Sequence, residues 1–264
     1  MKFKKIFSKK NCLLAIIIFT CIYLYFFLNQ IINNLPDVRK IKNIQLRSPV
    51  KIFYNNQKLS IQFNIHEYHP ITIKNFPKKL IQTFLIVEDS NFYIHHGFDL
   101  KGIIRAISNM IISGHISQGA STITQQLARN FFLSSEKNII RKIKEILLAI
   151  KIENFFSKKE ILELYLNKIC LGENCYGVSE AAKKYFNKTL NQLTLSETAI
   201  LAGLPKNPFI YNPIKSIKKT KKRRDIILKR MLYKNIISKK EYNIAKKTII
   251  LNNSHYKLIH IKDN

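Results

Sequence analysis

Two short stretches of the chain carry side chains that could do chemistry together. The first, Glu88 to Gly97, contains acidic and imidazole groups, and the second, Gln118 to Asn130, contains hydroxyl, amide and cationic groups. A carboxylate can take a proton from an attacking hydroxyl, and cations can stabilise an anionic leaving group. Together, these side chains could transfer a group from an anionic leaving group to an attacking hydroxyl.

Composition limits the possibilities without selecting one. The 264 residues leave room for one sizeable core plus appendages, and a hydrophobic content of 46% argues against disorder. The formal net charge of +29 favours an anionic partner such as a nucleic acid, a lipid headgroup or a phosphorylated substrate. Lysine, isoleucine and asparagine are abundant throughout the chain, so compositional drift explains the charge equally well.

The N-terminal segment predicts a membrane anchor. Five lysines precede an apolar run from Cys12 to Leu28, which has about the minimum length for a bilayer core of roughly 30 Å. Positive residues before the run favour a cytoplasmic N-terminus, although Arg39, Lys40 and Lys42 weaken the asymmetry. A cleavable signal peptide is the alternative, but the residues after the run offer no pair of small residues for a peptidase, which favours retention.

Beyond the anchor, the apolar pattern predicts a β-hairpin and then a mainly α body. Apolar and polar residues alternate from Val50 to Tyr54 and from Leu59 to Ile65, with Asn55 and Asn56 supplying the turn. From Phe76 onward, the apolar residues recur at the spacing of an α-helix. Four helix starts are marked by a hydroxyl residue followed three positions later by Glu or Gln: Thr122 with Gln125, Ser157 with Glu160, Thr194 with Glu197, and Ser238 with Glu241.

Residues that break helices or form turns divide the chain further. Asn-Pro pairs at 207–208 and 212–213 end the helical run, and a basic run from Lys215 to Arg224 leads into a helix with an apolar stripe and a solvated face. Cys170 and Cys175 flank a Gly-containing turn, where a disulfide and two free thiols are both compatible with the spacing. The predicted segments are a cytoplasmic tail (1–11), an anchor (12–32), a linker with the hairpin (33–75), a main domain (76–214) and a basic helical extension (215–264).

Four blocks in order make the chain similar to a known family. They are Glu88–Gly97, Gln118–Asn130, Arg141–Glu145 and Lys159–Lys168, with 202–206 and 211–213 closing the domain. From the anchor to about residue 250 the chain resembles the glycosyltransferase family 51 region of class A penicillin-binding proteins, the peptidoglycan polymerases, in particular the 1A-like members. The resemblance implies a lysozyme-like helical fold, the lipid-linked disaccharide-pentapeptide lipid II as substrate, and release of polyprenyl pyrophosphate.

The resemblance also implies roles for individual residues. Glu88 matches the general base that deprotonates the acceptor's 4-hydroxyl, with inversion at the donor's anomeric carbon, and its apolar neighbours are expected to raise its pKa. Glu145 matches a carboxylate that places the leaving pyrophosphate, directly or through a divalent cation. Arg129 stands where members often carry Lys, and Lys137 stands where many carry Arg. At position 137 a planar guanidinium, which can donate two parallel hydrogen bonds, is thus replaced by a compact ammonium group. The further candidates for substrate or pyrophosphate binding are Asp89, Phe92, His95, Thr122, Gln126, Arg141 and Lys142.

Each assignment has a structural alternative. Taken alone, Glu88 is an exposed acid at a helix end, Asp89 is a helix cap, and Glu145 is a surface ion pair with Arg141 four residues earlier. The apolar segment from residue 100 to residue 116 is either a membrane-dipping flap, as in the family, or part of the packed core. The ordered blocks favour the functional interpretation of the acids and leave the segment open.

The expected partners follow from the resemblance: lipid II, the growing glycan chain, the cytoplasmic membrane and other cell-wall synthesis proteins, with the main domain on the periplasmic side and no nucleic acid. No cofactor is expected to be required, although Mg²⁺ or Mn²⁺ held by Glu145 is left open. The serine transpeptidase of class A members does not fit in this chain, and its companion motifs are missing, so no penicillin-sensitive activity is expected.

Three other functions compete with this one. A lysozyme-like hydrolase also uses a single Glu in a helical cleft, but it has no pyrophosphate leaving group to explain the cations. A non-catalytic remnant that holds other wall-synthesis proteins at the membrane is opposed by the intact motif residues. A membrane-tethered nucleic-acid binder rests on charge alone and lacks a recognition motif.

Overall fold

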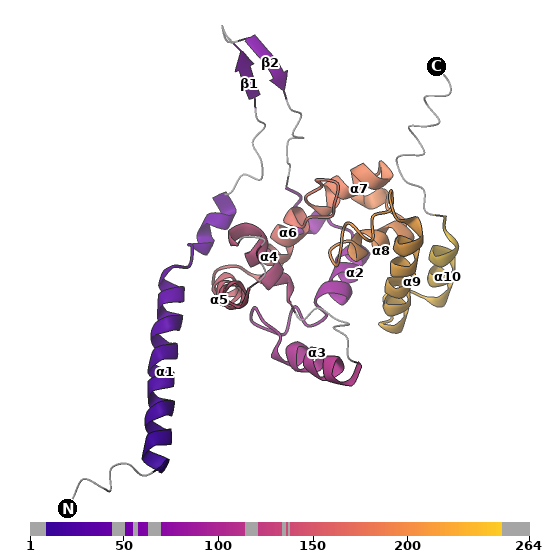
Figure 1. Cartoon of the computed structure of the whole chain (residues 1–264). Helices are drawn as coiled ribbons and strands as arrows, with labels where there is room; N and C mark the ends of the chain where they lie inside the picture. Colours follow the sequence, from indigo (N-terminus) through magenta and orange to yellow (C-terminus); the bar gives the residue numbers. More distant parts are fainter. Residues whose placement is uncertain are drawn as a thin grey trace, which may run out of the picture.

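A long apolar helix, α1 (Lys9–Asn33), extends from a body of shorter helices (Figure 1). The computed structural model describes residues 9–43, 51–54, 58–62, 70–113, 121–133, 136 and 138–249. Within the segment from Leu13 to Ile41, the most apolar 18-residue window has a mean hydropathy of 2.1, and only 6% of that window is buried inside the protein. By length and composition it can cross a membrane, which agrees with the predicted anchor.

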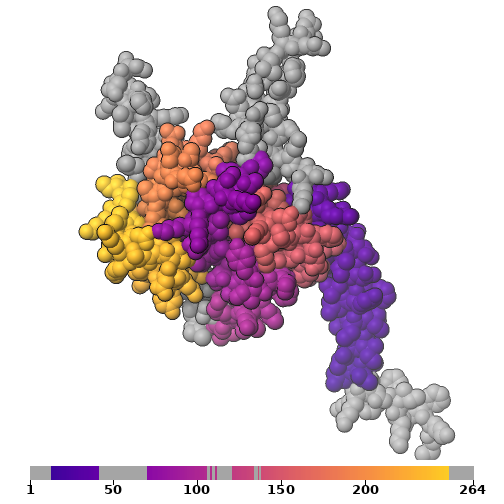
Figure 2. Space-filling view, turned by 180° about the vertical axis from the view of Figure 1, so that it is seen from behind, coloured from indigo at the N-terminus to yellow at the C-terminus, as the bar shows by residue number. Residues whose placement is uncertain are grey.

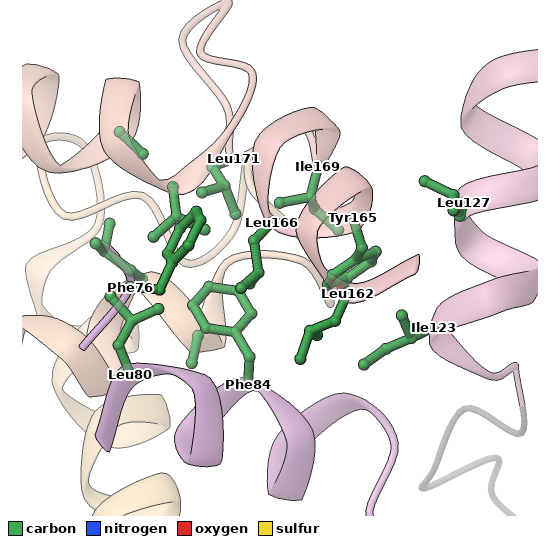
Figure 3. Packing of buried hydrophobic residues seen from close by; sticks show 14 of the residues in the cluster. Phe76, Leu80, Phe84, Ile123, Leu127, Leu162, Tyr165, Leu166, Ile169 and Leu171 are labelled. Atoms are coloured by element: carbon green, nitrogen blue, oxygen red, sulfur yellow. The ribbon is translucent and has the colours of Figure 1, made fainter. Parts of the chain in front are cut away.

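The described body is mainly α-helical, as predicted. Its helices are α2 (Lys78–Glu88), α3 (Leu100–Ser113), α4 (Ile123–Phe132), α5 (Ile139–Phe155), α6 (Lys158–Lys168), α7 (Val178–Phe186), α8 (Leu195–Gly203), α9 (Ile217–Tyr233) and α10 (Lys239–Lys247), with short 3-10 helices η2 (Val38–Asn43), η3 (Ile73–Asn75) and η4 (Leu190–Gln192). The larger hydrophobic core lies where α2, α4 and α6 meet (Figure 3). Phe84, Leu127 and Tyr165 are fully buried there, and side chains of this size stabilise the fold by roughly 1.5–3 kcal/mol each.

The four predicted capping boxes are confirmed. In each, the hydroxyl oxygen accepts a hydrogen bond from the backbone N–H three residues later, and the Glu or Gln at that position accepts one from the backbone N–H of the cap. The pairs are Thr122 with Gln125, Ser157 with Glu160, Thr194 with Glu197, and Ser238 with Glu241. They begin α4, α6, α8 and α10 at the predicted residues.

The anchor is fastened to the body by the segment that follows it. Val38 and Ile41 of η2 are 1% and 2% exposed, and both belong to the larger core. Helix α1 and η2 both contact α5. The first part of the predicted linker is therefore a packed element, because its apolar residues are buried against the body.

Two short strands, β1 (Lys51–Tyr54) and β2 (Lys58–Gln62), pair in antiparallel fashion. The register is irregular between Ile52 and Phe53. Residues 55–57, where the turn of the hairpin is predicted, lie outside the described residues. The complete hairpin therefore stays a prediction.

Helix α9 lies in the packed body, although the sequence predicted a domain edge near Pro213. Its Ile227, Leu228 and Met231 are buried in a second hydrophobic cluster, and α9 contacts both α2 and α8. Figure 2 shows the C-terminal helices, in yellow, lying against the rest of the body. The predicted boundary at residue 214 does not coincide with an edge of this body, because the apolar stripe of α9 is buried in a core.

A buried arginine joins α8, α9 and α10. Arg224 is 1% exposed. Its guanidinium donates hydrogen bonds to the carbonyl oxygens of Lys246 and Thr248, at 2.9 and 2.8 Å, and to the hydroxyl of Ser196, at 3.0 Å. It also forms an ion pair with Asp225. The charge is thus compensated and hydrogen-bonded, as a buried cation requires.

Helix α3 exposes apolar side chains. Leu100 and Ile104 are each 59% exposed, and Ile111 is 75% exposed. Figure 1 places α3 on the side of the body toward which α1 extends. Core packing therefore does not account for these three side chains, and residues 114–120, which complete the predicted flap, lie outside the described residues.

The two cysteines of the predicted turn are free thiols. Cys170 is exposed, whereas Cys175 is buried, and its thiol donates to the carbonyl oxygen of Glu173 at 3.7 Å. Burial raises the pKa of Cys175 to about 11. Of the two alternatives left open by the spacing, the structure has the free thiols.

Candidate active site

A cleft of about 540 Å³ opens where the end of α2, the start of α3, the first turns of α4 and one face of α9 come together. Glu88 and Asp89 lie on its wall. So do five cationic side chains from four segments: Arg105 of α3, Arg129 of α4, Lys206 after α8, and Arg223 and Arg230 of α9. The cleft thus has carboxylates (Glu88, Asp89 and Asp99) among several cations, so it can bind an anionic ligand beside a proton acceptor.

Glu88 is the last residue of α2 and is partly exposed to the cleft. The Gln126 side-chain amide donates a hydrogen bond from Nε2 to Glu88 Oε2, at 2.9 Å. Burial raises the pKa of Glu88, against the opposing effects of the Gln126 hydrogen bond and of the positive charges of Arg223 and Arg129. The predicted rise in pKa is confirmed in direction, and it suits a general base.

Asp89 ties the end of α2 to the beginning of α4. Its Oδ2 accepts hydrogen bonds from the ring Nε2 of His95, at 2.8 Å, and from the backbone N–H of Ile123, at 3.0 Å. The Asp89 side chain is 4% exposed. An acidic group at this place satisfies a free N–H of the first helical turn and complements the positive end of α4. Asp89 therefore fixes the position of Glu88 relative to α4.

Phe92 and His95 support this arrangement from behind the cleft. Phe92 is 1% exposed in the larger core, and neither residue lines the cleft. Lys158 Nζ lies over the Phe92 ring, 4.6 Å from its centroid, and donates to the His95 carbonyl oxygen at 2.6 Å. The sequence predicted substrate contacts for Phe92 and His95, but the structure places them as supports of the Asp89 loop, because the packing of this loop turns both side chains inward.

Thr122 and Gln126 present the beginning of α4 to the cleft. The Thr122 hydroxyl donates to the carbonyl oxygen of Gly97 at 2.7 Å. Gly97 has φ +91°, and a Cβ there would lie 2.8 Å from the backbone of Ala149, so only glycine fits this close approach to α5. The loop after Glu88 is thus held on both α4 and α5.

Glu145 is buried among cations, with its side chain 1% exposed. Arg141 donates to its Oε1, Lys142 Nζ lies 2.9 Å from its Oε2, and Arg129 Nη1 lies 3.9 Å from its Oε1. Lys142 also donates to Ser121, a residue of the cleft wall, at 2.8 Å. We name Arg129, Arg141 and Lys142 the Glu145 cations. The alternative of a surface ion pair is not what the structure has, because the carboxylate is buried and the cations outnumber it.

The Glu145 carboxylate does not fit a divalent cation in this arrangement. Both of its oxygens already accept from cationic donors. Magnesium and manganese take several oxygen ligands, and within the described ranges no group of three His, Cys, Asp or Glu side chains could hold a metal ion. Lys137, the other predicted pyrophosphate ligand, lies outside the described residues.

The cleft is also lined by cations that the sequence analysis did not single out: Arg105 of α3 and Arg223 and Arg230 of α9, which we name the α9-side cations. The pKa of Arg230 is lowered by burial and by the positive charges of Arg223 and Arg105. Arg223 also lies over the Tyr211 ring, 5.7 Å from its centroid. The two α9 arginines are about two helical turns apart and so share one face, a signal that the surrounding lysines obscured.

Two residues of the fourth sequence block, Glu163 and Asn167, hold the segment that leads into α2. Glu163 Oε2 accepts from the backbone N–H of Ile73 at 2.7 Å. Asn167 accepts from the N–H of Ile71 and donates to its carbonyl oxygen, at 3.0 and 2.8 Å. These side chains position the segment before Glu88 without lining the cleft.

Comparison with known proteins identifies the family. The Transglycosylase family model matches residues 56–232, so the chain belongs to the transglycosylase family. Penicillin-binding protein 1A of Vibrio cholerae is 46% identical over 97% of this chain and 31% of that protein, and penicillin-binding protein 1A of Escherichia coli is 48% identical over 84% and 26%. The chain thus spans under a third of the length of these relatives. A crystal structure of penicillin-binding protein 1A from Haemophilus influenzae is similar over 80% of this chain and 22% of that chain, with 31% identity and a TM-score of 0.45.

Proposed function

We propose that this chain is a peptidoglycan glycosyltransferase, which polymerises lipid II into glycan strands and releases polyprenyl pyrophosphate. The observation that carries the proposal is the placement of Glu88, a carboxylate of raised pKa, in a cleft lined by cations from α3, α4 and α9. Membership in the transglycosylase family supports it. A hydrolase of finished glycan has no diphosphate leaving group, so it would leave these cations without a role.

Glu88 acts as the general base. Its carboxylate takes the proton of the acceptor's 4-hydroxyl as that oxygen attacks the anomeric carbon of the donor. The bond from this carbon to the diphosphate oxygen breaks, and its electron pair leaves with the diphosphate, so an α-linked donor becomes a β-linked product. A raised pKa brings the base closer to the working pH, which favours proton transfer.

The Glu145 cations hold the leaving diphosphate. Charge-assisted hydrogen bonds from guanidinium and ammonium groups to phosphate oxygens are short and strong. They stabilise the charge that develops on the leaving group in the transition state. Glu145 orients the three cations and offsets their mutual repulsion, so it acts on the diphosphate through them. Lys137 stays a predicted fourth cation of this group.

The α9-side cations bind the second diphosphate. Joining two lipid-linked sugars brings two diphosphates to one cleft. Arg223 and Arg230 are on α9, whereas the Glu145 cations are on α4 and α5. The charge of Arg223 lowers the pKa of Glu88, and the charge of Glu88 acts on Arg230. This places the acceptor's diphosphate on the α9 side and leaves its 4-hydroxyl near the base.

We infer that α1 spans the cytoplasmic membrane with its N-terminus inside and the catalytic body on the periplasmic side. The lysines before α1 support this orientation. The exposed apolar side chains of α3 then face the lipid from which the substrate arrives. Lipid II, the growing glycan and the membrane are the proposed partners.

The decisive experiment is polymerisation of lipid II by the detergent-purified chain, with products resolved by glycan length. Wild type and a Glu160→Gln control should both make polymer. Glu160 does not line the cleft, and Gln at this position preserves the capping box of α6. Glu88→Gln should make none. If folded wild type binds lipid II without polymerising it, the proposal fails in favour of a non-catalytic scaffold. Release of soluble fragments from finished glycan would indicate a hydrolase.

A further inference from the structure

A fully buried hydroxyl stands directly behind the proposed base. Tyr165 of α6 is 0% exposed, and its ring lies in the larger core where α6 faces Ile123 and Leu127 of α4 (Figure 3). Its hydroxyl donates a hydrogen bond to Gln126 Oε1, at 3.2 Å. Gln126 in turn donates from Nε2 to Glu88 Oε2, at 2.9 Å. A continuous chain of hydrogen bonds therefore runs from the core to the Glu88 carboxylate.

The order of donors in this chain is fixed by chemistry. An ionised carboxylate only accepts hydrogen bonds, so Glu88 requires the NH₂ end of the Gln126 amide. The two ends of an amide have nearly the same shape, and the partner of the other end therefore decides which way the group points. A hydroxyl that donates to Oε1 favours the orientation in which Nε2 faces Glu88.

We propose that Tyr165 is a positioning residue for glycosyl transfer: its hydroxyl holds the Gln126 amide with the N–H toward Glu88 and thereby keeps the carboxylate ionised and aimed into the cleft. The inference rests on the proposed role of Glu88 as base. Burial raises the pKa of Tyr165 well above its ordinary value, so the hydroxyl keeps its proton and remains a donor.

The other charged groups that face Glu88 come from different elements. Asp89 adjoins it and raises its pKa, while Arg129 of α4 and Arg223 of α9 lower it. Arg230 of α9 is also within electrostatic reach. Replacing Tyr165 by Phe leaves all four in place and removes one buried hydroxyl, so a changed titration of Glu88 would report the loss of the amide's anchor.

The substitution Tyr165→Phe leaves the buried Gln126 Oε1 without its donor. The amide is then free to rotate and to present Oε1 to a protonated Glu88, an arrangement that stabilises the neutral acid. The pKa of Glu88 should rise by roughly half a unit to one unit. The acid limb of the pH–rate profile should move up by the same amount, with a rate near wild type at high pH.

A matched control exists in the same core. Tyr185 is also 0% exposed, and its hydroxyl donates to the Leu171 carbonyl oxygen, at 2.8 Å, away from the cleft. Tyr185→Phe removes an equally buried hydroxyl without touching Gln126. It should therefore leave both the titration of Glu88 and the pH–rate profile as in wild type.

The experiment combines the pH–rate profile of lipid II polymerisation with direct titration of Glu88 in ¹³C-Glu-labelled protein, assigned with Glu88→Gln. An upward shift in Tyr165→Phe but not in Tyr185→Phe supports the proposal. Equal titration in Tyr165→Phe and wild type overturns it, as does a loss of rate that is the same at every pH. If Tyr165→Phe shifts the titration of Glu88 but the wild-type protein makes no polymer, the proposed function is refuted and the role of Tyr165 in positioning Gln126 stands.

A second variant tests the same hydrogen bond from its other end. Gln126→Met removes the amide, so the pKa of Glu88 should rise in this variant too, and adding Tyr165→Phe should cause no further shift. This arm remains informative if Tyr165→Phe does not fold. An unchanged Glu88 titration in Gln126→Met, or an additional shift in the double variant, would overturn the proposal.

Discussion

Arg223 of α9 and Glu88 of α2 line the same cleft, and the guanidinium charge opposes the rise in pKa that burial imposes on the carboxylate. The two residues are 135 positions apart in the sequence, and the packing of α9 against α2 brings them to the same cleft. This relationship makes α9 part of the site. It also means that a substitution on α9 can change the ionisation of the proposed base.

Arg223→Met should lower polymerisation at neutral pH. The change keeps the apolar stem over Tyr211 but removes the charge that favours ionised Glu88, so the pKa of Glu88 rises and the acid limb moves to higher pH. Loss of an acceptor-side cation adds to this, and we expect kcat/KM to fall by about tenfold. Lys222→Met, on an exposed position of the same helix, is the control. Equal kcat/KM in both variants would contradict the assignment of Arg223 to the site.

Glu145→Gln should reduce both stability and activity. The variant leaves Arg141 and Lys142 beside a buried neutral group, which is costly when a buried ion pair loses one partner. Because both cations are partly exposed, we expect a destabilisation of about 2 kcal/mol rather than the full cost of a wholly buried pair. Urea unfolding measures this. Activity should remain low at a temperature where the variant is fully folded, since the cations are then misplaced for the diphosphate.

Glu88→Gln should stabilise the protein at neutral pH. A carboxyl whose folded pKa lies above its unfolded value of 4.5 binds its proton more readily in the folded state, so stability is present below that value and is lost as pH rises through the folded pKa. The neutral amide escapes this loss. We expect Tm to rise by about 2–4 °C at pH 7.5 and to match wild type near pH 4.

The contribution of Glu241 to stability depends on pH in the opposite direction from that of Glu88, and the same Tm measurements can test it. The ion pair with Lys79 and the hydrogen bonds from Ser238 lower the pKa of Glu241 to about 2. Its contribution is therefore present above pH 4.5 and is lost as pH falls toward 2. Glu241→Gln should slightly lower Tm at pH 7.5, because the pair is exposed. A fall in Tm for Glu88→Gln at neutral pH would contradict a raised pKa.

Local signals predicted much of the helical body. The capping boxes fixed the beginnings of four helices because a cap is formed by residues three positions apart, which the sequence displays directly. The spacing of Arg141 and Glu145 indicated their pairing on one helix face, whereas the role proposed for Glu88 came from the resemblance of its block to a family. Where local structure depends on neighbours along the chain, the sequence was sufficient to predict it.

What the sequence did not reveal depends on tertiary contacts. Nothing near Phe92 indicates that its ring is buried beneath Lys158, and nothing near Arg223 indicates that α9 packs on α2. In so lysine-rich a chain, two functional arginines do not stand out from solvated cations. Tyr165 shows the same limit, because its hydroxyl meets Gln126 only once α6 lies against α4.

The packing of η2 on α5 predicts that the cleft is held at a fixed place relative to the membrane. Val38→Ala combined with Ile41→Ala removes most of the buried apolar side chains of η2 that help to fasten the anchor to the body, while α1 itself stays intact. Activity on lipid II in proteoliposomes should fall roughly tenfold, because a small misplacement of a reacting group is costly. Activity on a short-chain lipid II analogue in detergent should change little.

Leu14→Ala is the matched control for this last prediction, because Leu14 is 58% exposed on α1 and does not belong to the core that holds η2. It should leave both activities near wild type. The comparison of bilayer with detergent separates loss of docking from loss of folding, since a misfolded body would fail in both. An equal loss in both media would mean that η2 stabilises the catalytic body itself, and unchanged activity in proteoliposomes would mean that the anchor only tethers it.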